Sequence, residues 1–195
     1  MIWLNTLRGW SRCRVATLAR WKGHKTFLAA LRQVPAVVPL RAYIVGDAIY
    51  RTEGSQLSVE ELRNDAEAAG IACRVGFTGF VRNVADAMRA LDVVVHASTE
   101  PEPFGMVIAE AMACGRAVVA SRSGGAAELI TDDVDALGHD PGDATQLARA
   151  IARLAADPVL RRRLGAAARA RAERTFDPRR LAASLVPIYR TIAQA

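Results

Sequence analysis

Two glutamates stand eight positions apart in the stretch TEPEPFGMVIAEAMACGRAVVAS, residues 99–121, around the expected start of a helix. Glu102 precedes that start, and Glu110 lies about one turn into the helix, from where it can reach a group bound at the helix end. Gly105 lets a ligand approach the backbone closely, and the next N–H groups would form an anion site. These donors belong to Met106, Val107 and Ile108. The pattern favours a phosphate held at this helix start.

The same glutamates also have a plainer interpretation. Glu102 could simply stabilise the helix dipole, and Glu110 could be an exposed helix residue. A single glutamate would favour that interpretation, whereas two glutamates around one helix start leave the ligand site open. The choice depends on where the rest of the chain places this helix.

Short apolar, β-branched runs alternate with stretches of helical spacing along the chain. The runs predict strands at 14–18, 40–45, 74–77, 92–97 and 117–120, and an edge strand at 135–138. Helices are predicted at 24–32, 83–90, 106–114 and 125–130, and one more between the capping box of Ser58 and Glu61 and its end at Gly70. This alternation indicates a mostly parallel sheet covered by helices on both sides. Because ligands bind beyond the carboxyl ends of such strands, Glu102 is expected at the ligand edge.

The pattern changes after residue 140. Asp143, Asp157 and Asp177 look like N-caps, and Pro158 and Pro178 suit the first helical position. Three successive helices and no further strand are therefore expected. The chain is predicted to be an α/β protein, with a Rossmann-like three-layer parallel sheet and a helical C-terminal segment.

The chain has 195 residues, of which 51% are apolar, so one well-buried domain or a tight pair of small ones is expected. Its net charge of +6 comes almost entirely from arginine, because Lys22 and Lys25 are the only lysines. Arginine without interleaved aromatic residues is not typical of a nucleic-acid surface, although it can favour phosphate ligands or anionic lipid. For the arginines at 161–174, a solvated helix face is favoured over a lipid site.

Cysteine usage and hydropathy bear on the compartment. Cys13, Cys73 and Cys114 lack metal-binding spacing and are expected to be reduced core thiols in a cytosolic protein. No apolar run is long enough to span a bilayer, and the N-terminal stretch does not have the pattern of a signal peptide. A cytoplasmic protein is expected, and a peripheral contact at the inner membrane face stays open.

Asp133 and Asp135 form an Asp-x-Asp pair of the kind that can hold a divalent cation. The pair follows a predicted helix and has the composition of a solvated turn, which is the favoured interpretation. His24, His96 and His139 show no i to i+4 pairing, so no metal site is expected. His96, at the carboxyl end of a predicted strand, either lines the ligand edge or is a structural histidine.

These residues resemble the retaining glycosyltransferases of family 4, group 1, whose GT-B fold places the active site between two Rossmann-like domains. The family's Glu-x7-Glu signature, E-x-F-G-x-x-x-x-E, is matched by Glu102, Phe104, Gly105 and Glu110. Other similar stretches are WKGHKTFLAAL at 21–31, GFTGF at 76–80, AEAMACGRAVVAS at 109–121 and GGAAELI at 124–130. The resemblance spans roughly residues 13–190, in order and at the expected spacing.

The resemblance implies a nucleoside-diphosphate sugar as the donor substrate, with no metal and no other cofactor. Lys22 would neutralise the diphosphate, helped by backbone N–H groups from Gly105 to Val107 at the helix start. Glu102, the catalytic candidate, would hydrogen-bond hydroxyls of the donor sugar, and Glu110 those of the ribose. Backbone groups near Phe80 and Val81 would meet the edge of the base. The full implied donor site is Lys22, Phe80, Val81, Phe104, Gly105, Met106, Val107 and Glu110.

By the same resemblance, residues 1–12 are a lead-in, residues 13–177 are the donor-binding Rossmann-like domain, and residues 178–195 form a C-terminal helix. The family's acceptor-binding half is not matched. In the family, closure of the two halves excludes water from the site. The isolated chain is therefore expected to be a hexosyltransferase-type donor domain that transfers weakly or not at all without an acceptor-binding domain or subunit.

One position departs from the family pattern. The family often has an arginine five residues before the lysine to share the diphosphate, and Thr17 stands there in this chain. Arg20 could substitute for it from the next turn of the loop. Thr17 and the unmatched half favour one alternative, a stand-alone nucleotide-sugar binding or regulatory module without transfer activity.

Two further alternatives follow from the fold class. A nicotinamide-dependent Rossmann enzyme would carry G-x-G-x-x-G after the first strand, and this sequence has no such motif there. The GT-B relatives that epimerise nucleotide sugars lack the motif context around Glu102 and Glu110. The glycosyltransferase donor domain is the hypothesis that the residues favour.

Overall fold

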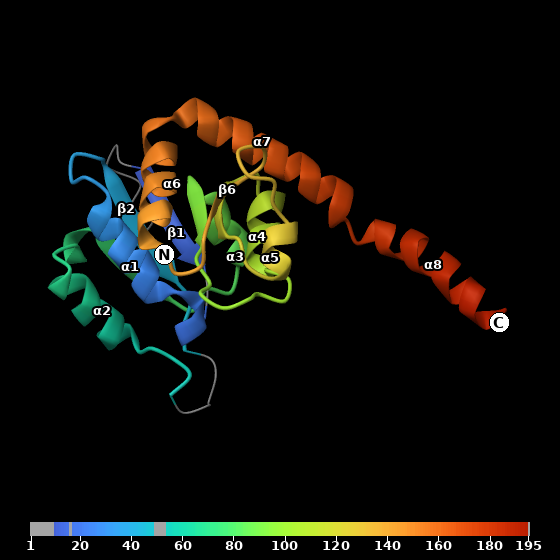
Figure 1. Ribbon diagram of the computed structural model, residues 1–195, viewed down its shortest axis with the longest axis horizontal. Helices are drawn as coiled ribbons and strands as arrows, with labels where there is room; N and C mark the ends of the chain where they lie inside the picture. The colour runs from blue at the N-terminus through green and yellow to red at the C-terminus, as the bar shows by residue number, and fades with distance from the viewer. Residues whose placement is uncertain (1–9, 16, 49–53, 195) are drawn as a thin grey trace.

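The computed structural model describes residues 10–15, 17–48 and 54–194, with a six-stranded sheet at its centre (Figure 1). The strands are β1 (Trp10–Val15), β2 (Leu40–Val45), β3 (Val75–Gly79), β4 (Val93–His96), β5 (Ala117–Ser121) and β6 (Leu137–His139). They lie in the order β3-β2-β1-β4-β5-β6, and every neighbouring pair is parallel. The predicted Rossmann-like parallel sheet is confirmed, with β6 at one edge.

Helices cover both faces of the sheet and complete the three layers (Figure 1). One face carries α1 (His24–Gln33), α2 (Val59–Ala68) and α6 (Ala144–Ala156). The other carries α3 (Val84–Arg89), α4 (Met106–Ala113) and α5 (Gly125–Glu128). The long helix α7 (Pro158–Thr175) belongs to both, because Leu160 and Leu164 pack with the first set and Ala168 and Ala172 with the second. The short 3-10 helices are η1 (Arg20–Lys22) and η2 (Ala72–Arg74), and α8 (Arg179–Ala193) ends the chain.

The central strand β4 shows why the strand sequences are apolar throughout rather than alternating. Val93 and Val95 pack against one layer of helices, Val94 packs against the other, and all three are completely buried. A parallel strand between two helical layers has no solvent face. Each valine buried in this way contributes on the order of 1.5–3 kcal/mol relative to an exposed one.

The chain changes direction across the sheet between β1 and β4. From β1 it builds outward through β2 and β3, and it then returns to start β4 on the other side of β1. The loops that follow β1 and β4 therefore leave the sheet side by side at its carboxyl edge. Sheets of this type bind ligands at such a topological switch point.

The first strand was predicted in the wrong place, and the N-cap residue of the last helix was predicted wrongly. The first strand is Trp10–Val15, not 14–18, and so begins within the predicted lead-in. It was missed because charged residues interrupt its apolar pattern. Leu18 and Ala19, which suggested a later strand, are buried but belong to the loop after it. The last helix begins at Arg179 with Pro178 as its N-cap residue, although an Asp177 carboxylate oxygen does accept the Arg179 N–H at 3.0 Å. The remaining predicted elements lie within a few residues of the observed ones.

The cysteines do not behave as a group of core thiols. Cys73 is exposed, and Cys114 is partly buried with its thiol 3.8 Å from the Ala85 carbonyl oxygen. The prediction of a core thiol was therefore wrong for Cys73, which lies in the short turn before β3. The side chain of Cys13 lies outside the described part of the structure.

Helix α8 projects away from the layered body (Figure 1). Every side chain of α8 that the structure describes is exposed, including the apolar Leu185, Ile188, Tyr189 and Ile192. Among the described residues, no helix is long and apolar enough to cross a membrane.

Candidate functional site

The predicted diphosphate lysine and the predicted sugar-binding glutamate form a direct ion pair. Lys22 Nζ lies 2.9 Å from Glu102 Oε1 and 2.6 Å from Glu102 Oε2, although 80 positions separate the two residues. Their side chains are only 20% and 15% exposed. Lys22 ends η1 after β1, and Glu102 lies in the loop after β4, so the switch point of the sheet brings them together.

Gly23 allows the loop after β1 to lie against the end of β4. Its φ of 69° is in the left-handed region, and a Cβ atom at this position would lie 1.9 Å from the Ala97 carbonyl oxygen. Beside it, the Trp21 carbonyl oxygen accepts the Thr99 N–H at 2.8 Å. The close approach requires glycine, and the hydrogen bond holds the Lys22 loop next to the Glu102 loop.

Two glycines after β5 contact the backbone of the Glu102 loop. The Gly125 N–H donates to the Glu102 carbonyl oxygen at 2.7 Å. A Cβ atom on Gly124 would lie 2.6 Å from that same oxygen, and one on Gly125 would lie 2.1 Å from the Pro103 carbonyl oxygen. The GGAAELI stretch therefore supports the backbone that carries the predicted catalytic carboxylate.

The Glu102 carboxylate is surrounded by hydrogen-bond donors. Ser98 Oγ donates to Glu102 Oε2 at 3.0 Å, and His96 Nε2 lies 3.4 Å from the same oxygen and 3.1 Å from Ser98 Oγ. The hydrogen bond from His96, with those from Lys22 and Ser98, lowers the pKa of Glu102 to about 2 against the opposing effect of burial. Glu102 is therefore fully ionised at neutral pH and can accept protons from hydroxyl groups.

The start of α4 has the geometry of the predicted anion site, with one correction. Gly105 precedes the helix with a φ of 93°, and Met106 and Val107 open the first turn. Among the described residues, the N–H groups of Met106 and Val107 have no hydrogen-bond acceptor, as expected for a helix start. The Ile108 N–H is not available, because it donates to the Gly105 carbonyl oxygen at 2.9 Å. Two donors rather than three therefore face outward.

Glu110 lies on the first helical turns of α4, on the exposed surface. Neighbouring atoms partly desolvate its carboxyl group and raise its pKa above the usual value. Hydroxyl donors of a ligand would stabilise the ionised form of such a carboxyl group. This environment is opposite to that of Glu102, whose carboxylate already has several donors within the protein.

The remaining predicted donor residues lie at the same edge but apart from the ion pair. Phe80 and Val81 follow β3, and β2 separates β3 from β1, so a ligand would have to extend across the sheet edge to reach them. Phe80 is 66% exposed. Phe104 packs edge-on against Phe176, at the end of α7, with ring centroids 6.0 Å apart. The signature loop is thereby tied to the junction that leads into α8.

Arg20, the suggested replacement for the missing arginine, has other partners in the structure. Its Nε donates to the Gly54 carbonyl oxygen at 2.8 Å, and its Nη2 lies 3.6 Å from Glu61 Oε1. Both partners belong to the segment that follows β2 and forms α2. Lys22 is thus the cation that the described loop after β1 presents to the site.

Asp133 and Asp135 are structural acceptors for arginines and do not converge on one point. The Asp133 carboxylate accepts two hydrogen bonds at 2.9 Å from Arg153, and buried Asp135 pairs with Arg171 at 2.8 Å. Among the described residues, no group of three His, Cys, Asp or Glu side chains could hold a metal ion. The interpretation of this Asp-x-Asp pair as a turn agrees with that geometry.

The arginines at 161–174 are not simply a solvated face, as had been expected. Arg161 is buried, and its guanidinium donates to the carbonyl oxygens of Leu154 and Ala155 at the end of α6. Arg171 donates to Asp135 and to the Glu128 carbonyl oxygen. Carbonyl groups at helix ends lack partners within the helix, and α7 supplies these partners from its arginines.

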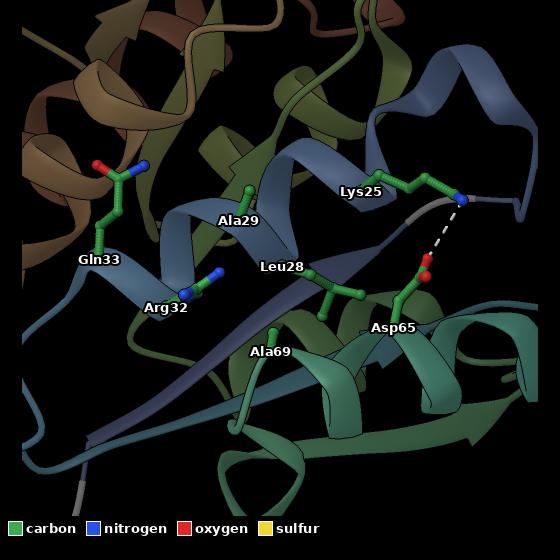
Figure 2. A pocket seen from close by; sticks show the side chains of 7 residues that line it. All are labelled: Lys25, Leu28, Ala29, Arg32, Gln33, Asp65 and Ala69. Atoms are coloured by element: carbon green, nitrogen blue, oxygen red, sulfur yellow. Dashed lines mark ion pairs between the residues drawn. The ribbon is translucent and has the colours of Figure 1, made fainter.

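A separate groove lies between α1 and α2 and contains none of the predicted site residues. Its volume is about 480 Å³. Figure 2 shows the side chains that line it, among them Lys25 and Asp65, whose ion pair is 3.4 Å long. Leu28, Ala29 and Ala69 form its apolar part. Its position on the helical face distinguishes it from the carboxyl edge that carries Lys22 and Glu102.

Sequence reasoning missed Ser98 as a functional residue and left His96 undecided. His96 is the last residue of β4, and Ser98 follows two positions later with 1% exposure. Position was the available signal, because both residues come directly after a buried strand whose carboxyl end meets the ligand edge. The turn that brings their side chains back to Glu102 could not be read from the sequence.

Comparison with known proteins matches the chain to one family. The profile of the family described as "Glycosyl transferases group 1" matches residues 13–171. The lipopolysaccharide core biosynthesis glycosyltransferase LpsD of Rhizobium meliloti (strain 1021) is 36% identical over 152 residues, which are 78% of this chain and 42% of LpsD. This chain thus spans less than half the length of that relative.

Solved structures agree with the sequence match. Anabaena HepE in complex with UDP-glucose is 35% identical, with a TM-score of 0.80 over 96% of this chain and 48% of HepE. The C-terminal domain of the group 1 family protein LpcC of Francisella tularensis is 26% identical, with a TM-score of 0.76 over 87% of both chains. The described fold therefore corresponds to a C-terminal domain of such a protein.

Proposed function

The chain belongs to the group 1 glycosyl transferases, and on that premise we propose that it binds a nucleoside-diphosphate sugar as the donor for glycosyl transfer. The observation that carries this proposal is the meeting of Lys22 with Glu102 at the switch point of the sheet, beside the start of α4. HepE, 35% identical to this chain, has been solved with UDP and with UDP-glucose. A uridine diphosphate sugar is therefore the first donor to test.

In this proposal each group at the sheet edge has a separate role. Lys22 and the outward N–H groups of Met106 and Val107 neutralise the diphosphate, which makes it a better leaving group. Glu102 accepts hydrogen bonds from hydroxyls of the sugar, and Glu110 accepts them from the ribose. Phe80 and Val81, further along the same edge, are proposed to contact the base of the nucleotide.

The proposal includes a hexosyl group as the transferred unit, retention of its anomeric configuration and no metal requirement. Lys22 and the positive end of the α4 dipole supply the charge that a cation supplies elsewhere. A cytoplasmic location, with peripheral contact at the inner membrane face left open, accords with a cytosolic supply of nucleotide sugars.

Transfer is proposed to need an acceptor-binding half as well. LpsD and HepE are each more than twice as long as the part that this chain matches. Helix α8 offers a strip for such a partner, because Leu185, Ile188, Tyr189 and Ile192 recur at helical spacing and are exposed. Without that half, the site lacks acceptor contacts and stays open to water, so the chain alone is expected to show little transfer.

Calorimetric titration of the purified chain with UDP tests the binding proposal. Lys22→Met should weaken UDP binding roughly 10- to 100-fold, the effect of losing a charge-assisted contact. Lys25→Met is the matched control, because it removes the only other lysine, which is 61% exposed and pairs with Asp65. Its UDP affinity should stay within about twofold of wild type. Absence of UDP binding, or equal effects of the two substitutions, would refute the proposed site.

A nucleotide-sugar binding or regulatory module without transfer activity is the second candidate. It is favoured by Thr17 at the position of the second cation and by the engagement of Arg20 elsewhere. Both candidates predict UDP binding and differ in catalysis. Sugar transfer after addition of an acceptor-binding half favours the enzyme, and donor binding without transfer in the assembled protein favours the module.

A further inference from the structure

The Glu102 carboxylate is held from two sides by groups of different character. On one side Lys22 contacts both carboxylate oxygens, at 2.9 and 2.6 Å. On the other side Ser98 Oγ donates to Oε2 at 3.0 Å, and His96 Nε2 lies 3.4 Å from that oxygen. The cation comes from the loop after β1, whereas Ser98 and His96 belong to β4 and its own loop.

The available hydrogens decide the direction of the hydrogen bonds among His96, Ser98 and Glu102. The Ser98 hydroxyl has one hydrogen, which it donates to Glu102, so its oxygen can only accept from His96 Nε2 at 3.1 Å. His96 must then carry a proton on Nε2. The result is a chain of donors from His96 through Ser98 to Glu102, built from side chains that are 6% and 1% exposed at its first two positions. Buried donors of this kind are fixed by packing.

Donor binding places a second demand on Lys22. In the proposed function this lysine faces the diphosphate, which carries more negative charge than one carboxylate. When the Lys22 ammonium turns to the phosphates, its ion pair with Glu102 weakens. Without other partners, the Glu102 carboxylate would then be free to rotate. Ser98 and His96 are not proposed to bind the phosphates. They remain in place because both lie at the end of β4.

We propose that Ser98 and His96 are positioning residues that hold the Glu102 carboxylate toward the donor sugar while Lys22 engages the diphosphate. This inference rests on the proposed function and adds two residues to it. Neither residue need touch the donor. Their effect should appear in recognition of the sugar and not in recognition of the nucleoside diphosphate.

The test compares two ligands on the same protein, UDP and UDP-glucose, by calorimetry. The measured quantity is the ratio of the UDP dissociation constant to that of UDP-glucose. Ser98→Ala should lower this ratio about tenfold, with the UDP affinity itself within about twofold of wild type. Ser121→Ala is the matched control, since Ser121 is also a fully buried serine, at the end of neighbouring strand β5. It should leave the ratio unchanged.

A double-mutant cycle and a conservative variant separate positioning from general structural support. When Glu102 is already Gln, adding Ser98→Ala should lower the ratio no further, because the two residues act through one group. His96→Gln, which can retain a donor near the Nε2 position, should keep most of the ratio, whereas His96→Leu should lose it. If Ser98→Ala fails to fold, the comparison of His96→Gln with His96→Leu still tests the proposal.

The outcomes distinguish this inference from the function on which it rests. If wild-type protein binds neither UDP nor UDP-glucose, the proposed function itself fails. If UDP binds and depends on Lys22 while Ser98→Ala and His96→Leu leave the ratio intact, the positioning role is overturned and the donor site stands. An effect of Ser98→Ala that persists undiminished beside Glu102→Gln also overturns it.

Discussion

The ion pair between Lys22 and Glu102 gives two side chains partners when no donor is bound. Both are largely buried at the sheet edge, with 20% and 15% exposure, and each would leave an uncompensated charge without the other. In the proposed function, a diphosphate would compete for the lysine, and sugar hydroxyls would compete for the carboxylate. The proposed donor therefore exchanges existing contacts for its own and need not enter an empty charged site.

The low pKa of Glu102 predicts a pH-dependent contribution to stability. Its pKa is about 2 in the folded protein against 4.5 as the ordinary value. The contribution is therefore complete above pH 4.5 and is lost as the pH falls toward 2. Glu102→Gln should lower the free energy of unfolding at pH 7 by at most about 3 kcal/mol, and about 2 kcal/mol of that difference should disappear by pH 3.

Urea unfolding of wild type and Glu102→Gln, followed by circular dichroism at pH 7, 5 and 3, measures this difference. At pH 3 the carboxyl group is almost fully protonated in the unfolded chain but still largely ionised in the folded protein, so the difference should fall to about 1 kcal/mol. A difference that stays constant from pH 7 to pH 3 would contradict the assigned environment of Glu102.

At the residue scale the sequence predicted the charged partners better than the groups that orient them. Lys22 and Glu102 were identified from their motifs, and the structure pairs them. Ser98 was missed, because its contact depends on the turn after β4 and not on a spacing. Arg20 was suggested as a second cation for the diphosphate, whereas in the structure its contacts are with Gly54 and Glu61.

At the element scale, close contacts between loops position the site. The loop after β1 rests on the end of β4 through Gly23, and the Glu102 loop rests on Gly124 and Gly125. Close backbone approaches at these glycines therefore fix the positions of both loops. A side chain at any of these glycines would push the neighbouring loop away and separate Lys22 from Glu102.

Gly23→Ala tests this dependence, with Gly70→Ala as its matched control. Both glycines have a φ of +69°, but the new Cβ would lie 1.9 Å from the Ala97 carbonyl oxygen at position 23 and meets nothing within 4 Å at position 70. Backbone strain should cost both variants about 1 kcal/mol. Steric overlap should cost Gly23→Ala roughly 1–3 kcal/mol more and abolish UDP binding.

Chemical denaturation and UDP calorimetry on the two variants provide the measurement. Gly70→Ala should bind UDP like wild type. Equal stability and equal UDP affinity in both variants would show that the approach of the β1 loop to β4 is not required for the site.

Most elements could be predicted because their apolar periodicity is strong. β4 and β5 read as continuous apolar runs, and the Ser58–Glu61 capping box marks α2. β1 was placed too late, because Ser11, Arg12 and Arg14 interrupt its pattern. Its position in the sheet is set by pairing with β2 and β4, which local sequence does not reveal.

At the scale of the whole molecule, the layered body and α8 are expected to be energetically separate. The first half of α7 buries Leu160 and Leu164 in the core, and the second half buries Ala168 and Ala172. Helix α8 buries none of the side chains that the structure describes in it. Its apolar strip is available to the proposed acceptor-binding half.

Two truncations check this separation. Removal of residues 178–195 should change the free energy of unfolding of the remainder by less than about 0.5 kcal/mol and its UDP affinity by less than about twofold. Removal of residues 158–195 also deletes the buried residues of α7 and should leave the chain unfolded, since each buried leucine alone contributes about 2–5 kcal/mol. Thermal unfolding and calorimetry report both results. A large loss of stability on removing α8 alone would contradict the described packing.

The most direct test of the donor site is a titration of the isotopically labelled chain with UDP, followed by amide nuclear magnetic resonance. The account predicts the largest shifts at the N–H groups of Gly105, Met106 and Val107, with changes at Lys22, and little change around the α1–α2 groove. Lys22→Met should remove these shifts at the same UDP concentration. Shifts centred on Lys25, Arg32 and Asp65 in that groove, with the start of α4 unaffected, would contradict the central claim.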